Sequence, residues 1–383
     1  MRITDVLAHP MEAERERPAW TAHESFHLDR LILVEVRTDE GIVGTGEIAI
    51  GPQASVCEMV DLIATVIKGQ DPLGHAALWQ RMLSVTNPRP GGIGGWDGLP
   101  PPLPRHLRQF YMAAMAGIDI AIWDIKGKAA GLPVFRLLGG TRTEVFTYGV
   151  GGFYVEGGPL LAVADEFAGY VENGFRAVKL KAGALSLDDE IARVRAVREA
   201  IGPDVLFMLD VNAPFDLEAA IAYSHAVEPF DIFWFEEPLH WYLQPADFVN
   251  LAKATNIPLA HGEREMHRLT TRDFIDSGAI RYIMYDSTRY GGFTEALRVS
   301  HYAEQKGVSN SPHSAPHIHA HLVSAFAESS FAAECVGDKR LHPIHERIYG
   351  GGARYRDGHV HLTEAPGFGL DIDWDAVRAL RSQ

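Results

Sequence analysis

The chain has 383 residues, of which 46% are hydrophobic and 22% charged, a composition that provides a large apolar core and excludes a disulfide-stapled module or extensive disorder. At about 150 residues per domain, this length predicts two domains or one large barrel with an appendage. The formal net charge of −15 argues against nucleic acid or an anionic membrane surface as a partner.

The sequence shows no pattern typical of a membrane span or of export. No apolar run approaches the roughly 18 residues that cross a bilayer, and the first residues lack the basic-then-apolar layout of a signal peptide. The two cysteines, Cys57 and Cys335, lie far apart and outside any CxxC pattern. We therefore expect a protein of the reducing cytoplasm.

The first 130 residues predict a small α+β domain. Strand-like runs at 31–36 and 42–50 flank a turn-forming Asp-Glu-Gly and indicate a β-hairpin, and helical patterns follow at 56–68, 75–84 and 106–130. Between these helices, residues 87–104 are rich in Gly and Pro and carry Trp96, which is compatible with a lid. The glycines there do not form GxGxxG after a strand, so dinucleotide binding is unsupported.

Residues 143–337 alternate short apolar strands with longer amphipathic helices, the clearest of which begins at a capping box on Ser186. Eight alternating β/α units predict a TIM barrel. Residues 359–380 indicate a strand pair and a short helix that pack back on the first domain. The chain thus divides into 1–130, 131–350 and 351–383. The eight predicted strands are 145–150, 177–181, 206–211, 232–235, 257–260, 282–285, 308–311 and 331–333.

The active site of a TIM barrel lies at the carboxyl ends of its strands. A single acid just after a strand is most often a helix cap or a solvated loop residue. Here, however, every predicted strand from the second onward ends in a charged or titratable group, at spacings that each match one β/α unit. These groups are Lys179 and Lys181, Asp210, Glu236, Glu263, Asp286, His313 and Glu334.

Asp210, Glu236 and Glu263 follow three neighbouring predicted strands, so their carboxylates would meet on one side of the barrel mouth. They would repel one another severely without a cation. An all-oxygen set suits a hard divalent cation, and Mg²⁺ is favoured because it keeps positions open for water and substrate. Since side chains alternate along a strand, Glu236 is expected to face the axis and Glu237 to point outward or to support the site.

Two candidate bases flank this predicted metal site. Lys179 and Lys181 are two residues apart on one strand and face the same way, so we expect each ammonium to lower the other's pKa and to poise one lysine as a general base. Asp286 beside His313 forms the second candidate, because the carboxylate can orient the imidazole and stabilise its protonated form. The two strands lie roughly across the barrel from each other, which would place one base on each face of a substrate.

Two other functions compete with this interpretation. The run HSAPHIHAH suggests a zinc hydrolase, since His317 and His321 are one helical turn apart, although no HExxH arrangement is present. The other alternative is a protein that is not an enzyme and whose barrel has only a structural or binding role. The complete set of charged strand ends argues against it.

Over nearly its whole length the sequence resembles the enolase superfamily, and specifically its mandelate racemase subgroup. This resemblance implies a (β/α)7-8 TIM barrel with an N-terminal α+β capping domain that the C-terminal segment completes, and a homo-oligomer. It rests on GIDIAIWDIKGK at 117–128, LGG at 138–140, the KxK of Lys179 and Lys181, the DxN of Asp210 and Asn212, the EEP that begins at Glu236, and Asp286 followed by Gly291-Gly292.

The resemblance also implies a role for each strand-end residue. Asp210, Glu236 and Glu263 become the Mg²⁺ ligands. Lys181 becomes the base on one face, with Lys179 as its electrostatic partner. His313 with Asp286 becomes the acid or base on the other face, and Glu334 hydrogen-bonds the substrate carboxylate. The loop at 12–25 and the segment 87–104 would close over the substrate, and the candidate substrate-binding residues are Asn212, Arg264, Arg289, Trp20, Trp96 and His23.

The implied first step removes the proton α to a carboxylate and gives an enediolate, so a small carboxylate is the expected substrate. We expect dehydration of an acid sugar, an aldonate or aldarate, to a 2-keto-3-deoxy acid. Return of a proton from the opposite face would instead make the protein a racemase or epimerase. Loss of a ring oxygen would make it a cycloisomerase.

Overall fold

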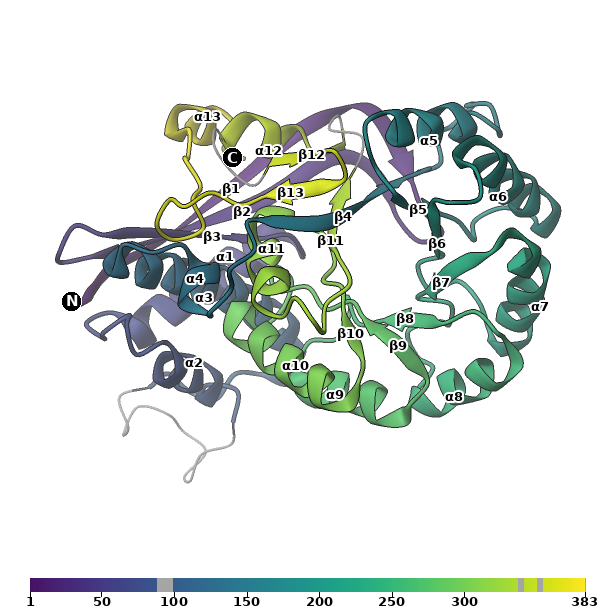
Figure 1. Cartoon of the computed structure of the whole chain (residues 1–383). Helices are drawn as coiled ribbons and strands as arrows, with labels where there is room; N and C mark the ends of the chain where they lie inside the picture. Colours follow the sequence, from purple (N-terminus) through teal and green to yellow (C-terminus); the bar gives the residue numbers. More distant parts are fainter. Residues whose placement is uncertain (88–98, 337–340, 350–353, 383) are drawn as a thin grey trace.

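The computed structural model describes residues 1–87, 99–336, 341–349 and 354–382. In Figure 1 the amino-terminal part, purple to blue, lies beside a ring of strands that is surrounded by helices. No helix in these described ranges combines the length and the apolar character that crossing a lipid bilayer requires.

The amino-terminal part is a three-stranded antiparallel sheet packed on helices. The sheet has the order β1-β2-β3. Gly44 on β3 allows the sheet to approach α3 closely, because a Cβ there would lie 2.1 Å from the carbonyl oxygen of Ala121. The elements are β1 (Ile3–Trp20), β2 (Ser25–Thr38), β3 (Val43–Ile48), α1 (Gln53–Ile67), α2 (His75–Ser84), a 3-10 turn η1 (Arg105–Leu107) and α3 (Arg108–Ala130).

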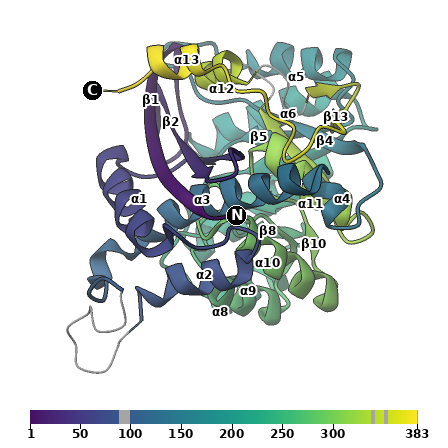
Figure 2. The ribbon, with the colours of Figure 1, turned by 90° about the vertical axis from the view of Figure 1, so that its left-hand side faces the viewer.

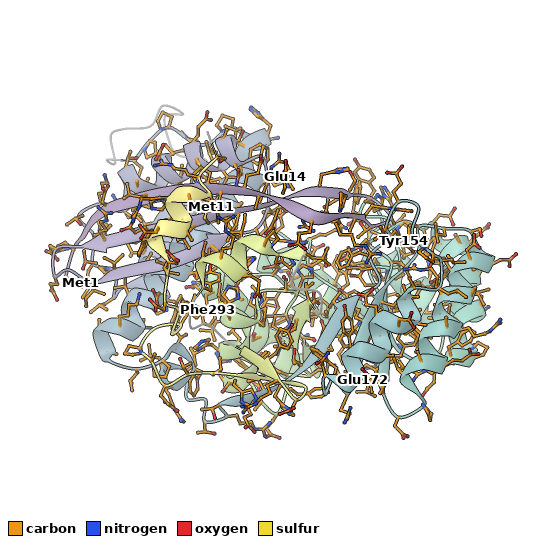
Figure 3. All side chains as sticks on the ribbon, turned by 90° about the horizontal axis from the view of Figure 1, so that it is seen from above. Met1, Met11, Glu14, Tyr154, Glu172 and Phe293 are labelled. Carbon is orange, nitrogen blue, oxygen red and sulfur yellow. The ribbon has the colours of Figure 1, made fainter. Side chains whose placement is uncertain are left out.

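The expectation of a loop over residues 12–25 is wrong. Glu12 to Trp20 form the second half of β1, which pairs with β2 from Glu12 opposite Arg30 to Trp20 opposite Ser25, with one irregularity between Glu14 and Ala19. The exposed charged residues hide the strand in the sequence, whereas backbone pairing with residues 25–30 of β2 forms it. Figure 3 shows β1 extending from Met1 past Met11 and Glu14 toward Tyr154 in the barrel.

Eight parallel strands form the predicted barrel. They pair in the order β10-β9-β8-β7-β6-β5-β4, and β11 pairs with the other edge of β4. Asn310 on β10 is hydrogen-bonded to Ser329 and Phe331 just before β11, which links the two ends of the ring. The strands are β4 (Glu144–Gly151), β5 (Ala177–Lys181), β6 (Leu206–Asp210), β7 (Ile232–Glu236), β8 (Leu259–His261), β9 (Ile280–Ile283), β10 (Ser309–Asn310) and β11 (Ala333–Val336).

Helices cover the outside of the ring, and both faces of β5 are buried. On β5, Val178 and Leu180 pack outward into the main core, while Ala177 joins the cluster that fills the barrel interior with Met208 and Trp234. The covering elements are α4 (Val134–Leu137), α5 (Val163–Glu172), α6 (Leu187–Ile201), α7 (Leu217–Val227), η2 (Glu228–Phe230), α8 (Pro245–Ala254), α9 (Arg268–Ser277), α10 (Gly292–Lys306) and α11 (Pro316–Ala325).

Seven of the eight predicted barrel strands are confirmed with shifts of at most two residues at their ends, whereas the eighth, predicted at 331–333, overlaps β11 only at Ala333. The strand predicted at 177–181 has these bounds, whereas the one predicted at 282–285 spans Ile280–Ile283. The predicted helix cap is also present, since the Ser186 hydroxyl accepts a hydrogen bond from the Asp189 amide.

The carboxyl-terminal segment divides its contacts between the two parts of the molecule. It contains α12 (Pro343–Ile348), β12 (Arg354–Arg356), β13 (His359–His361) and α13 (Trp374–Ala379), of which α12 was not expected. Strand β13 pairs with β4 of the barrel. Helices α12 and α13 cover β1 and β2 through a core that includes Met11, Leu33, Ile344 and Val377, and Figures 1 and 2 both show them beside β1.

Candidate active site

Three carboxylates meet at the carboxyl ends of neighbouring barrel strands. Asp210 ends β6 and pairs with Glu236, which ends β7, and Glu263 follows β8. All three side chains are buried, and one oxygen from each lies within 4.8 Å of the others. This compact all-oxygen set fits a hard divalent cation such as Mg²⁺. Glu263 Oε2 accepts no well-aligned hydrogen bond among the described residues, although His313 Nε2 lies 3.1 Å away, so a bound ion would give this oxygen a direct partner.

Gly262 directs Glu263 toward this cluster. Its φ of +137° lies outside the range that L side chains ordinarily adopt, and a Cβ at this position would lie 2.7 Å from Ile283 Cδ1. The backbone therefore requires glycine at the residue just before the carboxylate.

Lys179 and Lys181 both point toward the carboxylates from β5. Lys179 Nζ lies 2.9 Å from each Glu236 oxygen and 2.7 Å from Glu334 Oε2. Lys181 Nζ donates a hydrogen bond to Asp210 Oδ2. Each ammonium group is thus paired with at least one carboxylate.

Lys179 lowers the pKa of Lys181, as expected, but the expectation that one lysine therefore has a lowered pKa overall is wrong for this arrangement. Burial has the largest single effect and lowers the pKa of Lys181, as does Lys179, but Asp210, Glu263 and Glu334 together raise the pKa above its usual value. Burial also lowers the pKa of Lys179, yet Glu236 and Glu334 raise it well above its usual range. Carboxylates from other strands, which strand spacing alone does not reveal, decide the direction.

His313 approaches the carboxylates from the β10 side of the ring. Its Nδ1 lies 2.8 Å from Asp286 Oδ2, and its Nε2 lies 3.1 Å from Glu263 Oε2. Asp286 is fixed in turn, because its other oxygen accepts hydrogen bonds from the amide and hydroxyl of Thr288. Burial raises the pKa of Asp286, but the hydrogen bond and positive charge of His313 lower it below its usual value. An ionised Asp286 holds a proton on Nδ1 and leaves Nε2 facing the site.

Glu334 lies between the two candidate bases. Its Oε2 accepts from Lys179 and from the Tyr148 hydroxyl at 2.7 Å, and its Oε1 lies 3.8 Å from His313 Nε2. Burial raises the pKa of Glu334, but Lys179 and the other nearby cations lower it to about 2. Tyr148 was missed at the sequence level. Its inward position two residues after Phe146 on an otherwise apolar strand was the available signal.

Of the predicted substrate-binding residues, Arg289 and Asn212 lie at the carboxylate cluster. Arg289 Nη1 lies 3.0 Å from Glu263 Oε1, and its Nε lies 3.4 Å from Asp286 Oδ2. The backbone amide of Asn212 donates a hydrogen bond to Asp210 Oδ1. The side-chain oxygen of Asn212 is buried without a hydrogen-bond partner in the described part of the chain.

Arg264, by contrast, turns toward a different carboxylate. Its Nε lies 2.7 Å from Glu237 Oε2, and Glu237 also lies 2.9 Å from His261. Glu237 is therefore buried in its own ion-pair cluster, in agreement with the expectation that only Glu236 faces the axis.

The β1–β2 turn reaches the barrel. Trp20 stacks on Tyr154 with ring centroids 4.5 Å apart, and the two residues also pair through their backbones. His23 Nε2 lies 2.9 Å from the carbonyl oxygen of Ala213, which follows Asn212. Figure 3 shows this end of the sheet beside Tyr154. Trp96 lies outside the described residues.

The histidine pair suggested for a zinc hydrolase does not form. His317 Nε2 lies 3.0 Å from Glu47, whereas His321 Nδ1 accepts a hydrogen bond from the Phe135 amide. None of the potential metal-binding groups found in the described ranges includes His321.

Similarity in sequence and fold to known proteins places the chain in a family. The family described as "Enolase C-terminal domain-like" matches residues 162–376, and the "Mandelate racemase / muconate lactonizing enzyme, N-terminal domain" matches residues 3–139. The chain is 30% identical to the D-galactarolactone cycloisomerase of Agrobacterium fabrum, covering 100% of this chain and 99% of that one. It is 28% identical to the arabinonate dehydratase of Saccharolobus solfataricus, covering 90% and 89% respectively.

A solved structure agrees with this placement. The L-talarate/galactarate dehydratase of Salmonella typhimurium, liganded with Mg and L-lyxarohydroxamate, superposes with a TM-score of 0.85 at 27% identity and covers 100% of this chain and 93% of that one. The protein therefore belongs to the enolase superfamily, in its mandelate racemase and muconate lactonizing enzyme group.

Proposed function

We propose that this enzyme removes the proton α to the carboxylate of an acid sugar and then expels the β-hydroxyl, giving a 2-keto-3-deoxy acid. One observation carries the proposal: Lys181 and His313, from β5 and from the end of β10, both reach the same three-carboxylate cluster, one at Asp210 and the other at Glu263. Two titratable groups on different sides of one cation site suit a reaction that moves two protons.

The three carboxylates, Asp210, Glu236 and Glu263, would hold the Mg²⁺. When bound, the ion would draw charge from the substrate carboxylate, which acidifies the α-proton, and would offset the negative charge that raises the pKa of Lys181. The remaining chemistry belongs to the side chains of this chain.

In the proposed reaction, Lys181 Nζ starts as the uncharged amine and takes the α-proton from one face of the substrate, which leaves it as an ammonium group. Lys179 stays charged between Glu236 and Glu334 and keeps Lys181 in a positive field. The substrate carboxylate gains negative charge as the enediolate forms, and these ammonium groups stabilise that charge without reorganising.

His313 then donates a proton from Nε2 to the departing hydroxyl, which leaves as water. Asp286 holds Nδ1–H and stabilises the imidazolium before this transfer. Arg289, which contacts both Glu263 and Asp286, positions these two carboxylates.

Cycloisomerisation is the second candidate function. It is favoured by the full-length similarity to a D-galactarolactone cycloisomerase, since 100% of this chain aligns with 99% of that enzyme. The same proton abstraction would then be followed by loss of a ring oxygen in place of a free hydroxyl.

The test is incubation of the protein and Mg²⁺ with a panel of aldonates, aldarates and their lactones. Keto-acid product, detected as its semicarbazone, supports dehydration, whereas ring opening of a lactone followed by NMR supports cycloisomerisation. Exchange of the α-proton in D₂O without a keto acid indicates a racemase or epimerase. Failure to exchange the α-proton of any acid in the panel would contradict the proposal.

A further inference from the structure

A second group of potential metal ligands lies away from the three-carboxylate cluster. Glu47 on β3, His317 on α11 and His345 on α12 each offer one ligand atom, and these atoms lie within 4.8 Å of one another. Glu47 Oε2 lies 3.0 Å from His317 Nε2 and 3.2 Å from His345 Nε2. The Glu47 side chain is 1% exposed and that of His317 9%, so the carboxylate is nearly removed from water.

The surroundings of this triad contain further donors. The Tyr349 hydroxyl donates to the same Glu47 oxygen at 2.7 Å. His345 also belongs to an adjoining group of potential ligands that contains Asp29 and His342. In that group His342 Nδ1 lies 3.8 Å from Asp29 Oδ1. His345 Nδ1 is buried without a hydrogen-bond partner among the described residues. The imidazole thus has carboxylates on two sides.

The distances agree with the edges of a tetrahedral metal site. With metal–ligand bonds of about 2.0–2.1 Å, two ligand atoms of a tetrahedral zinc ion lie about 3.3–3.4 Å apart. The two nitrogen-to-oxygen separations in the structure, 3.0 and 3.2 Å, are within a few tenths of an ångström of that value. Two imidazoles with one carboxylate suit Zn²⁺ and its late first-row neighbours, whereas Mg²⁺ prefers oxygen ligands alone.

Charge at the triad is compatible with a cation. Glu47 contributes a buried carboxylate to the triad, and His317 and His345 contribute two imidazoles. Asp29 adds a second buried carboxylate, and Arg15 lies 3.6 Å from it.

We infer that Glu47, His317 and His345 form a second metal site, selective for Zn²⁺ or another late first-row divalent ion. The site joins three segments that are far apart in the sequence: the capping sheet, the helix that follows His313, and the helix that follows β11. A metal bound there stabilises the folded chain, because unfolding separates the ligands. This inference does not depend on the proposed reaction.

The test uses the full-length protein, stripped of metal by a chelator and dialysed with Co²⁺ or Zn²⁺ in excess Mg²⁺. We expect one tightly held late-metal equivalent per chain by elemental analysis, a tetrahedral Co²⁺ absorption spectrum, and a higher Tm with Zn²⁺. His317→Gln and His345→Gln should lose this equivalent. The exposed His225 provides the matched control, because His225→Gln should keep it.

Asp210→Asn distinguishes the two sites. This variant loses a ligand of the three-carboxylate cluster and should keep the Co²⁺ spectrum. If a histidine variant does not fold, the wild-type Co²⁺ form decides by NMR, because two shifted imidazole N–H signals are expected. The inference is overturned if the wild-type chain holds no late metal under Mg²⁺, if Asp210→Asn abolishes the bound equivalent, or if the Co²⁺ form shows no imidazole N–H signals.

Discussion

Asp286 holds the imidazole of His313 through a 2.8 Å contact between Oδ2 and Nδ1. This contact turns Nε2 toward Glu263 and Glu334, which carry negative charge at the centre of the site. The direction in which His313 can move a proton is therefore set by a residue that follows the neighbouring strand β9.

Asp286→Asn should lower kcat by about 10²–10⁴-fold, the usual contribution of a general acid or base. Asparagine can keep the position of the imidazole but cannot stabilise its protonated form. Steady-state kinetics measure kcat, and calorimetry measures the Mg²⁺ affinity of the same variant. An unchanged kcat, with Mg²⁺ affinity also unchanged, would contradict the role of Asp286.

Glu263→Gln should weaken Mg²⁺ binding by at least about 100-fold, because a direct carboxylate ligand contributes more than the 10–100-fold typical of a supporting residue. Isothermal titration calorimetry measures the affinity. Glu265→Gln is the matched control, since Glu265 lies two residues away and contacts His261. Equal affinity in the two variants would exclude Glu263 as a ligand.

Lys179→Met should destabilise the metal-free protein by about 3–5 kcal/mol, because it leaves the buried carboxylates of Glu236 and Glu334 without their cation. Added Mg²⁺ should restore part of this loss by replacing the missing positive charge. Urea unfolding with and without Mg²⁺ tests both statements. Lys253→Met, at an exposed position on α8, is the control. If both variants lose the same stability, Lys179 does not have this role.

His321 should make the fold sensitive to acid. Burial lowers its pKa to about 3, since its Nδ1 accepts the Phe135 amide and the ring is enclosed. In the unfolded chain the His321 imidazole takes up a proton below about pH 6.5, whereas in the folded state it does so only near pH 3. The stability from His321 is thus present above that pH and is lost as pH falls toward 3, and at pH 5 the loss is about 2 kcal/mol.

Urea unfolding at pH 7 and pH 5 measures the His321 effect. His321→Gln keeps an acceptor for the Phe135 amide but cannot titrate, so its stability should fall less between the two pH values than that of the wild type. His225→Gln, at an exposed site, should behave like the wild type. An equal fall in wild type and His321→Gln would refute the assignment.

Local patterns in the sequence were sufficient to predict the barrel and the positions of its strand-end groups. The period-two alternation on residues 177–181 places Lys179 and Lys181 on one face, and the apolar residues between them mark the buried strand. Because parallel strands of a barrel end at the same rim, Asp210 and Glu236 could be expected to meet, and they pair directly. These inferences need only short-range periodicity and one rule of topology.

Only the tertiary structure determined which groups lie next to each charged side chain. The direction in which the pKa of Lys181 moves depends on carboxylates from other strands, and Glu334 has a partner, Tyr148, that lies 186 residues away. Pairing with β2 makes a strand of the charged second half of β1. His317 meets Glu47 in place of His321, across 270 residues. Electrostatic energies and strand pairing depend on distance in space, and that distance is set by packing of the whole chain.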